Sequence, residues 1–579
     1  MTGSILLESA KDHSVHKTSI NDLPREILQK IAVRLTQRTV VNLVYVCRLW
    51  NAILTPLLYK HIEIYSTDQF HQLHRAILST ASNRQLGRLV QEIWFSKEFD
   101  ENAHILSLQE VTSRNEAWYC SGLSSFLQEW EGLQKIHIEY RLRSPVALSS
   151  QFLRDRLLTL TMNIVQMEEW IDVISSFPCL QVLDMYFIAN EENETEGKVS
   201  FAQLETLQNN LVHLQSLTME HLRINGDIPK EIVPCESVRS LSLSVKEGTR
   251  WGQYFAEKYT KLEYLEIMDT YEIPVHTDNE LQPLVRSCHH LRTFLIDNEP
   301  AYRFVLRSLG ERAAQLGYIS YLGNDGSWLS ESIQCFHKTL STVHLYSDIE
   351  LPIEETVDHL KTCPSLADLR LVCASDTLFI DWLLDELGGL QHLHLSGDYV
   401  VIKARDSATI PHKLKTLIML VRHTEDSVYT YLSRCCPHLS TLDCWYSKDD
   451  HRPRKICYPN PGLKHLGINV QGDCIYQIKK VAEVESIWEW NEAHQSFVEK
   501  KQNRTCTQWY RKLNGTIVRF SSSAVAKFFN DQNDRINTIH TGIAQQSNQK
   551  SEVSYTLPVV SIVCHYVEEI TLNWACIFN

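Results

Sequence analysis

The sequence predicts an α/β protein in which a small amino-terminal helical module precedes a long solenoid of strand–helix units. A triplet of the form aliphatic-x-x-aliphatic-x-aliphatic recurs fourteen times between Leu133 and Ile468, and eleven of its thirteen intervals measure 23–26 residues. Segments with helical spacing separate the triplets, whereas residues 20–62 follow a different period. Units this short cannot bury their apolar faces alone, so neighbouring units must stack.

The amino-terminal module is predicted to contain two amphipathic helices. The first begins at Asp22, a favourable N-cap, with Pro24 early in the helix. Its apolar stripe consists of Ile27, Leu28, Ile31 and Leu35. The second helix is expected to start at Thr39 and to carry Leu43, Val46, Cys47, Trp50 and Ile53 on one face. Two helices of this size need support from the solenoid or from a partner.

Each triplet is predicted to form a short strand whose second and third aliphatic residues point into a core, while the residue between them points out. Helical spacing follows each strand, as in Val357, Leu360 and Cys363. The strands are therefore expected to form a parallel sheet on the concave face of a curved solenoid, with helices on its convex face. Further copies are expected at residues 90–95 and 567–572.

Charge and composition exclude several classes of function. Among 579 residues the formal net charge is −14, which disfavours binding to nucleic acid or to an anionic membrane. No run of about 20 apolar residues is present, so no membrane span is expected. None of the 16 cysteines stands in a C-x-x-C pair, and we expect no metal site and no cofactor. The chain is expected in the cytoplasm, the nucleus or both.

The repeated part, roughly residues 86–480, resembles the leucine-rich repeat family. Several units are similar to its cysteine-containing variety, in which a helix ends in Cys-Pro before the next triplet, as at Cys363-Pro364 and Cys436-Pro437. The proline ends the helix and favours the extended strand that follows. These cysteines are interpreted as packing residues.

The amino-terminal module resembles an F-box. The resemblance rests on Leu23-Pro24-x-Glu26-Ile27-Leu28-x-x-Ile31 followed by Val46-Cys47-Arg48-x-Trp50, over about 45 residues. It implies the substrate receptor of a cullin-RING ubiquitin ligase, docked on a Skp-type adaptor through its F-box and binding an unknown protein substrate through its repeats. The residues implied in adaptor binding are Leu23, Pro24, Glu26, Ile27, Ile31, Val46 and Trp50, although Trp50 and Ile31 are equally explained by packing within the module.

The predicted domain organisation has five parts: a flexible terminus (1–19), the F-box (20–65), a linker with the first degenerate repeats (66–132), the solenoid (133–484) and an irregular carboxyl-terminal cap (485–579). The polar segment 530–554 inside the cap is expected to be disordered.

The substrate is expected on the concave face, where each triplet exposes two positions per strand. Early units place acidic residues there, including Asp184 and Glu220. Later units carry aromatic, histidine and arginine side chains, which are typical anchors in protein interfaces. The candidate substrate-binding residues are His344, Tyr346, Arg370, His394, Leu420 and Trp445.

Two alternatives remain at the level of sequence. In one, the helical module only caps a leucine-rich scaffold that acts outside a ubiquitin ligase. In the other, an enzyme lies in residues 485–579, which contain Cys506, His540 and His565, but no motif of recognisable spacing supports it. We therefore expect a non-catalytic protein.

Overall fold

The structure is a computed structural model of the chain. It describes residues 24–33, 37–78, 86–96, 127, 130–141, 148, 151–164, 167–187, 198–247, 250–268, 277–296, 299–322, 326–347, 353–373, 377–403, 411–446, 454–458, 462–471, 474–481, 485–491, 496–502, 505–513, 516–521, 559–564, 569–572 and 575–578. The chain divides into two compact units: unit 1 comprises residues 1–262 and 267–274, and unit 2 comprises residues 263–266 and 275–579.

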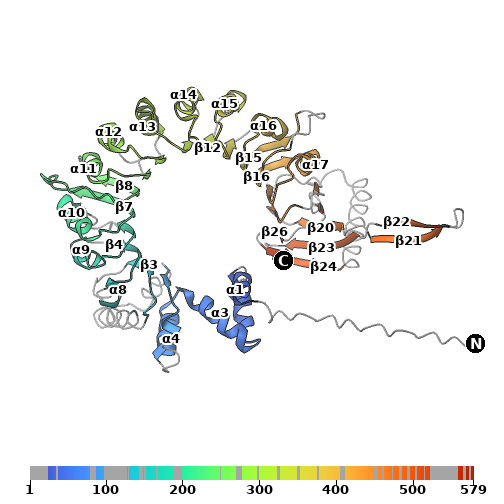
Figure 1. Ribbon diagram of the computed structural model, residues 1–579, viewed down its shortest axis with the longest axis horizontal. Coiled ribbons are helices and arrows are strands. Elements are labelled where there is room, and N and C mark those ends of the chain that lie inside the picture. The colour runs from blue at the N-terminus through green and yellow to red at the C-terminus, as the bar shows by residue number, and fades with distance from the viewer. Residues whose placement is uncertain are drawn as a thin grey trace, which may run out of the picture. The chain divides into compact units, whose positions relative to one another are not determined.

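Unit 1 begins with three helices and continues as strands that alternate with helices (Figure 1). Its helices are α1 (Arg25–Val33), α2 (Gln37–Val44), α3 (Arg48–Lys60), α4 (Thr67–Leu78), α8 (Gln151–Arg154), α9 (Met167–Ser175), α10 (Phe201–Asn210) and α11 (Trp251–Lys258). Its strands are β1 (His61–Ile64), β2 (Glu92–Phe95), β3 (Lys135–Arg141), β4 (Thr159–Ile164), β5 (Val182–Phe187), β6 (Lys198–Ser200), β7 (Ser216–Asn225) and β8 (Ser240–Glu247).

Helices α1, α2 and α3 form a helical module, residues 24–60, with a small core of its own. The carbonyl of Pro24 accepts hydrogen bonds from the backbone N–H groups of Ile27 and Leu28, which starts α1. The core residues come from all three helices and are Leu28, Ala32, Val40, Trp50, Ile53 and Leu54. At about 1.5–3 kcal/mol per buried large apolar side chain, this core stabilises the module only modestly.

The expectation of one continuous second helix is wrong, because two helices, α2 and α3, occupy that segment. The chain turns at Tyr45 and Val46, and Cys47 is extended, with φ −159° and ψ 168°, so that α3 starts anew at Arg48. Thr39 lies inside α2, two residues after its first residue, and not at the start of a helix. Residues 45–47 contain neither proline nor glycine, and their apolar spacing continues that of the flanking helices. Packing of α2 against α3 therefore sets a break that periodicity alone does not reveal.

The module passes directly into the repeats. Helix α3 ends at Lys60 and β1 begins at His61, and β1 pairs in parallel with β2, with His61 opposite Glu92. Strand β2 is the expected repeat at residues 90–95, and it pairs with β3. Parallel pairing continues through β4, β5, β7 and β8. Repeats therefore begin at residue 61, inside the range assigned to the F-box and ahead of the range assigned to a linker.

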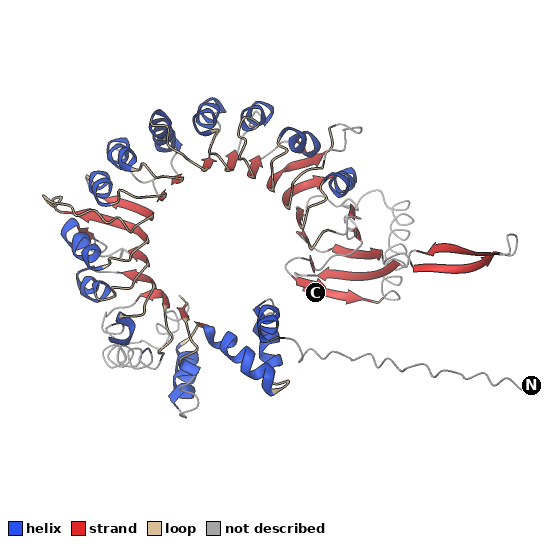
Figure 2. Ribbon diagram, in the orientation of Figure 1, coloured by secondary structure: helices blue, strands red, loops and turns tan. Residues whose placement is uncertain are grey.

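Unit 2 continues the same pattern, with helices on one side of the strands (Figure 2). Its helices are α12 (Thr277–Ser287), α13 (Glu299–Glu311), α14 (Gly326–Phe336), α15 (Ile353–Leu360), α16 (Ile380–Glu386) and α17 (Asp426–Cys435). Its repeat strands are β9 (Tyr264–Ile267), β10 (Thr293–Ile296), β11 (Tyr318–Leu322), β12 (Thr342–Ser347), β13 (Asp368–Cys373), β14 (Thr377–Phe379), β15 (His392–Val401), β16 (Thr416–Thr424), β17 (Thr441–Tyr446), β19 (His465–Val470) and β26 (Glu569–Leu572).

The register of unit 2 confirms the predicted repeat. Leu369 pairs with Leu393, and Leu393 pairs with Leu417, so equivalent triplet positions lie side by side in the sheet. The second and third aliphatics of the triplets are buried, as Leu369 and Leu371 illustrate at 0% exposure. The residues between them lie on the opposite face of the sheet, away from the helices. We call this face the strand face.

The helix-ending cysteines are packing residues, as expected. Cys363, Cys435 and Cys436 are buried behind the ends of α15 and α17. Burial raises the pKa of the Cys363 thiol to about 11 and that of Cys436 to about 12. Both thiols are therefore protonated at neutral pH, which removes the nucleophilic thiolate.

The described residues of 485–579 form strands, whereas the sequence suggested an irregular cap. Strands β18 (Arg454–Tyr458), β20 (Cys474–Val481), β23 (Thr505–Leu513), β24 (Thr516–Phe520) and β25 (Val559–Cys564) make a five-stranded sheet. Strand β26 pairs in parallel with β19, confirming the late repeat copy expected at 567–572, and in antiparallel with β27 (Ala575–Phe578). Strands β21 (Glu485–Asn491) and β22 (Ser496–Gln502) pair only with each other among the described strands. The repeat period hid this sheet because its strands are mostly joined by long, non-repeating connections.

Two expectations fall outside the described residues: the flexible terminus 1–19 and the disordered segment 530–554. Within the part of the chain that the structure does describe, no helix combines the length and the hydropathy needed to cross a lipid bilayer.

Candidate protein-interaction surfaces

The helical module exposes an unusual amount of apolar surface. Eleven large apolar side chains are exposed among the described residues, and six of them lie between residues 27 and 49. These six are Ile27 (41% exposed), Val33 (73%), Val41 (37%), Tyr45 (84%), Val46 (63%) and Leu49 (40%). Burial of such side chains against a partner is favourable, so their concentration in one small module indicates a protein-interaction surface.

The residues that the sequence assigned to adaptor binding divide into three groups. Pro24, Glu26, Ile27 and Val46 are exposed, and Ile31 is half-buried. Trp50 is only 4% exposed and packs in the core of the module, so its assignment to the surface is corrected to a packing role. Leu23 lies outside the described residues.

Sequence reasoning missed four members of this surface: Val33, Val41, Tyr45 and Leu49. Helix α1 buries Leu28 and Ala32, four residues apart, which leaves Val33 on the opposite side. The sequence signal that could have revealed this surface is a second apolar stripe on one short helix, because packing in a single core requires only one stripe.

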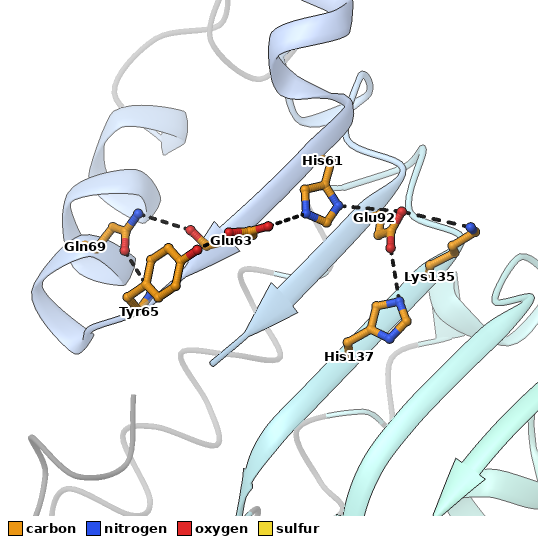
Figure 3. Close-up of polar contacts among 7 residues, drawn as sticks. All are labelled: His61, Glu63, Tyr65, Gln69, Glu92, Lys135 and His137. Atoms are coloured by element: carbon orange, nitrogen blue, oxygen red, sulfur yellow. Dashed lines mark hydrogen bonds and ion pairs between the residues drawn. The ribbon is translucent and has the colours of Figure 1, made fainter. Parts of the chain in front are cut away.

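The strand face of unit 1 carries a polar network that begins next to the helical module (Figure 3). The carboxylate of Glu92 lies 3.1 Å from Nε2 of His137, 3.6 Å from Nδ1 of His61 and 3.9 Å from Nζ of Lys135. His61 also lies 3.0 Å from Glu63, whose other oxygen accepts a hydrogen bond from the Tyr65 hydroxyl. These residues come from β1, β2 and β3 and from Tyr65, which directly follows β1, and they connect the first three strands.

The network continues across β4 and β5. Nδ1 of His137 lies 3.0 Å from the Thr161 hydroxyl, which donates a hydrogen bond of 3.0 Å to Asp184. The ring of His137 also stacks on Trp94, with 4.9 Å between ring centroids and 21° between planes. Polar groups on this face are therefore bound largely by one another.

Burial and neighbouring charge affect this network in opposite directions. Burial lowers the pKa of His137, against the raising effect of the Glu92 carboxylate. Hydrogen bonds from Tyr65 and His61 lower the pKa of Glu63. Burial, with the charges of Asp184 and Glu220, raises the pKa of Tyr186. The acidic character expected for the early strand face is thus present at these positions.

The strand face of unit 2 contains the six predicted substrate-binding residues. His344, Arg370 and His394 occupy equivalent positions on β12, β13 and β15, and Tyr346 is equivalent to Leu420 and Trp445 on β16 and β17. All six side chains are half-buried. The structure thus brings them onto one face, in two adjacent columns.

The columns are linked by contacts between the side chains. The guanidinium carbon of Arg370 lies 5.2 Å from the centroid of the Tyr346 ring, within range of a cation–π interaction. Nδ1 of His344 lies 2.9 Å from the Tyr318 hydroxyl, and the His344 ring lies edge-on to Tyr318. These contacts hold the aromatic rings and the guanidinium in place.

Among the polar atoms of this face that are buried and have no hydrogen-bond partner in the described part of the chain, two belong to the predicted substrate-binding residues. They are Nε of Arg370 and Nε2 of His394. Burial, with the charges of Arg370 and His344, lowers the pKa of His394 to about 4, and burial likewise lowers the pKa of His344. Both histidines are therefore neutral at pH 7, and Arg370 is the permanent cation of the cluster.

The described residues offer no metal-binding cluster to the enzyme alternative. No group of three or more His, Cys, Asp or Glu side chains there is placed to hold a metal ion. The side chains of Cys506, His540 and His565, which the enzyme alternative would use, lie outside the described set.

A comparison with protein families assigns the helical module and the first strands to one domain. Residues 20–98 match the family model described as the COS11 F-box domain, which covers the helical module, β1, α4 and β2. No curated protein matches the chain. Among solved structures, the mouse RP105/MD-1 complex is similar with 13% identity and a TM-score of 0.33, over 66% of this chain and 63% of that chain.

The TLR13–ssRNA13 complex is similar with 14% identity and a TM-score of 0.28, over 59% of this chain and 64% of that chain. The chain thus spans less than two thirds of either protein. Both TM-scores lie below 0.5. The family match and the repeat geometry show that the chain carries an F-box domain in residues 20–98, joined to strand–helix repeats of the leucine-rich type.

Proposed function

We propose that this protein is a non-catalytic substrate receptor of a Skp–cullin–F-box ubiquitin ligase. The F-box domain binds a Skp-type adaptor, and the repeats hold a protein target. Ubiquitin then reaches target lysines through other subunits, because holding the target near them raises its effective concentration. The observation that carries the proposal is the set of six exposed apolar side chains between residues 27 and 49.

The exposure of this set argues for a partner. Tyr45 and Val46 are 84% and 63% exposed and lie in the turn between α2 and α3, so the core of the module does not require them. Central apolar and aromatic side chains in an interface each contribute about 2 kcal/mol or more to binding. F-box domains generally bind Skp-type adaptors, and the match at residues 20–98 supports that partner for this surface.

The alternative is that the helical module only caps the repeats. One observation favours it: α3 runs without a linker into β1, the first strand of the sheet. A cap, however, buries its apolar residues against the repeats, and the six exposed side chains are left uncovered. The two roles are compatible, and the test concerns adaptor binding alone.

The test is co-purification of the full chain with a co-expressed Skp-type adaptor. We expect the wild type to retain the adaptor and the double variant Tyr45→Ala, Val46→Asp to lose it. Val212→Asp is the matched control, because Val212 is a 59% exposed valine of unit 1 outside the module, and it should retain the adaptor. Failure of the folded wild type to bind any Skp-type adaptor would leave only the cap.

A further inference from the structure

The strand face of unit 2 shows which kind of target segment fits it. This inference rests on the proposed role of that face in holding a protein target. Its basis is a cluster in which Arg370 and His394 are neighbours on paired strands and both present a polar nitrogen that no described residue satisfies. Buried donors without partners are costly, at about 1–3 kcal/mol each, so an acceptor from a ligand gains by meeting them.

The charge of the cluster favours a single negative charge. Arg370 is its permanent cation, and it forms no ion pair with another described residue. Asp368 lies two residues away on the same strand and raises the pKa of His344 by its negative charge. One guanidinium next to one carboxylate suits a monoanion with two oxygens, such as a Glu or Asp side chain, better than a dianionic phosphate.

The geometry of the guanidinium supports the same conclusion. The contact with the Tyr346 ring holds the guanidinium of Arg370 on this face, and a guanidinium pairs in bidentate fashion with a planar carboxylate. The neighbouring His394 is neutral, so one ring nitrogen donates a hydrogen bond without adding charge.

An apolar region lies beside this cluster on the same face. Leu420 pairs with Trp445 on the next strand, and Ile418 precedes Leu420 at the adjacent outward position. Strand β13, which carries Arg370, is separated from β16 by β15 alone. At about 4.8 Å between strands, Arg370 and the region of Leu420 and Trp445 are about 10–14 Å apart.

An extended peptide advances about 3.3 Å per residue, so it spans this distance in three or four residues. Because successive side chains of an extended peptide point to opposite faces, only a spacing of four places both side chains on the same side. We infer that the strand face of unit 2 binds an extended target segment in which a Glu or Asp side chain pairs with Arg370 and His394 and a large apolar side chain, four residues away, packs on Leu420 and Trp445.

The experiment is a peptide array probed with the purified full chain. The peptides are extended Gly/Ser-rich octamers in which Glu, Gln, Lys or phosphoserine occupies one position and Leu or Ser occupies a second, at spacings of one to five residues and in both orders. We expect the strongest binding for Glu with Leu at a spacing of four, with Glu preferred over Gln by about tenfold or more.

Variants assign the two halves of the site. Arg370→Gln should remove the preference for Glu and keep that for Leu, whereas Leu420→Ala should do the reverse. The matched control is Arg422→Gln, since Arg422 lies two residues beyond Leu420 on β16 but is already paired with Asp398 at 3.1 Å. Arg370→Lys, which keeps the charge and loses the fork, should show an intermediate preference for Glu.

Several results would overturn the inference. Preference for phosphoserine over Glu would assign a phosphate site, preference for Lys would contradict the charge argument, and no spacing preference would contradict the two-part site. If Arg422→Gln lost the preference for Glu and Arg370→Gln kept it, Arg422 and not Arg370 would be the cation of the site. Adaptor co-purification of the same preparations separates the ligase role from the peptide site. Peptide selection without adaptor binding overturns only the ligase role. Adaptor binding without peptide selection overturns only the peptide site.

Discussion

The strand faces of the two units are built on the same repeat but use their polar side chains differently. In unit 1, Glu92 contacts His61 and His137, and Thr161 joins His137 to Asp184. In unit 2, Arg370 stacks on a tyrosine while its Nε atom has no hydrogen-bond partner among the described residues. Polar groups that contact one another stabilise the fold, whereas a donor without a partner gains by meeting an acceptor from a ligand. Identical backbone geometry thus supports either role, and the outward side chains decide which.

The largest loss of stability is expected from a variant that breaks the polar network of unit 1. Glu92→Ala removes a carboxylate that contacts three basic side chains and is only 26% exposed, so we expect unit 1 to lose about 2 kcal/mol of stability. Hydrogen exchange measured by mass spectrometry resolves the effect by unit.

Glu131→Ala is the matched control for Glu92→Ala. Glu131 pairs with Arg88, but its side chain is 48% exposed and that of Arg88 is 61% exposed, so about 0.5 kcal/mol or less should be lost. In unit 2, Arg370→Ala should cost less than Glu92→Ala. Equal losses for Arg370→Ala and Glu92→Ala would contradict the distinction between the two faces.

The next effect concerns the link between β3, β4 and β5. Thr161→Val keeps the shape of the side chain but leaves His137 and Asp184 without their shared hydroxyl, so we expect a loss of about 1–1.5 kcal/mol. Chemical denaturation followed by fluorescence measures it. Thr206→Val, which removes an exposed hydroxyl bonded to its own helix, should change stability by less than about 0.5 kcal/mol. A Thr161→Val protein as stable as the wild type would show that the link is not stabilising.

A smaller effect follows from acid titration of unit 2. The pKa of His394 falls from an ordinary 6.5 to about 4 in the folded chain, so its stabilising contribution is complete above pH 6.5 and is lost as the pH falls toward 4. The wild type loses stability between pH 7 and pH 5. We expect this loss to be about 1 kcal/mol smaller in His394→Gln, a figure that allows for solvent screening of a half-exposed ring. Parallel pH–stability curves for the two proteins would refute this.

The smallest effect links His394 to the proposed peptide site. A carboxylate beside His394 raises its pKa in the complex, so binding takes up protons and affinity increases as the pH falls. Between pH 7.5 and pH 6 we expect about a threefold gain for the Glu/Leu peptide, measured by fluorescence anisotropy. His394→Gln should bind with no such gain, and an affinity that falls with pH would contradict the placement of the carboxylate.

Much of the fold was predictable because the repeat is a local pattern that recurs. Alternation within each triplet predicted correctly that Leu369 and Leu371 are buried and that Arg370 lies on the other face. The shared columns of His344 with Arg370 and of Tyr346 with Leu420 followed from the same count. Because the repeat spacing is regular, the position of a residue within its repeat predicts its place in the sheet.

The helical module was less predictable. Spacing grouped Val46 and Trp50 on one helix face, yet Val46 is 63% exposed and Trp50 is 4% exposed. The turn at residues 45–47 separates them, and it carries no glycine or proline to announce it. Apolar residues serve both a core and an interface, so periodicity alone does not distinguish these roles.

The sequence by itself determined the order of the parts, the period of the repeat and the side chains that line the strand face, because each depends on spacing along one chain. Tertiary structure alone decided where α2 ends, how the late strands join β19, and which polar groups find partners. Those outcomes depend on contacts between residues far apart in the sequence, as when Thr161 meets Asp184 or Arg370 meets Tyr346. Partner satisfaction is a property of distance in space, which no local pattern encodes.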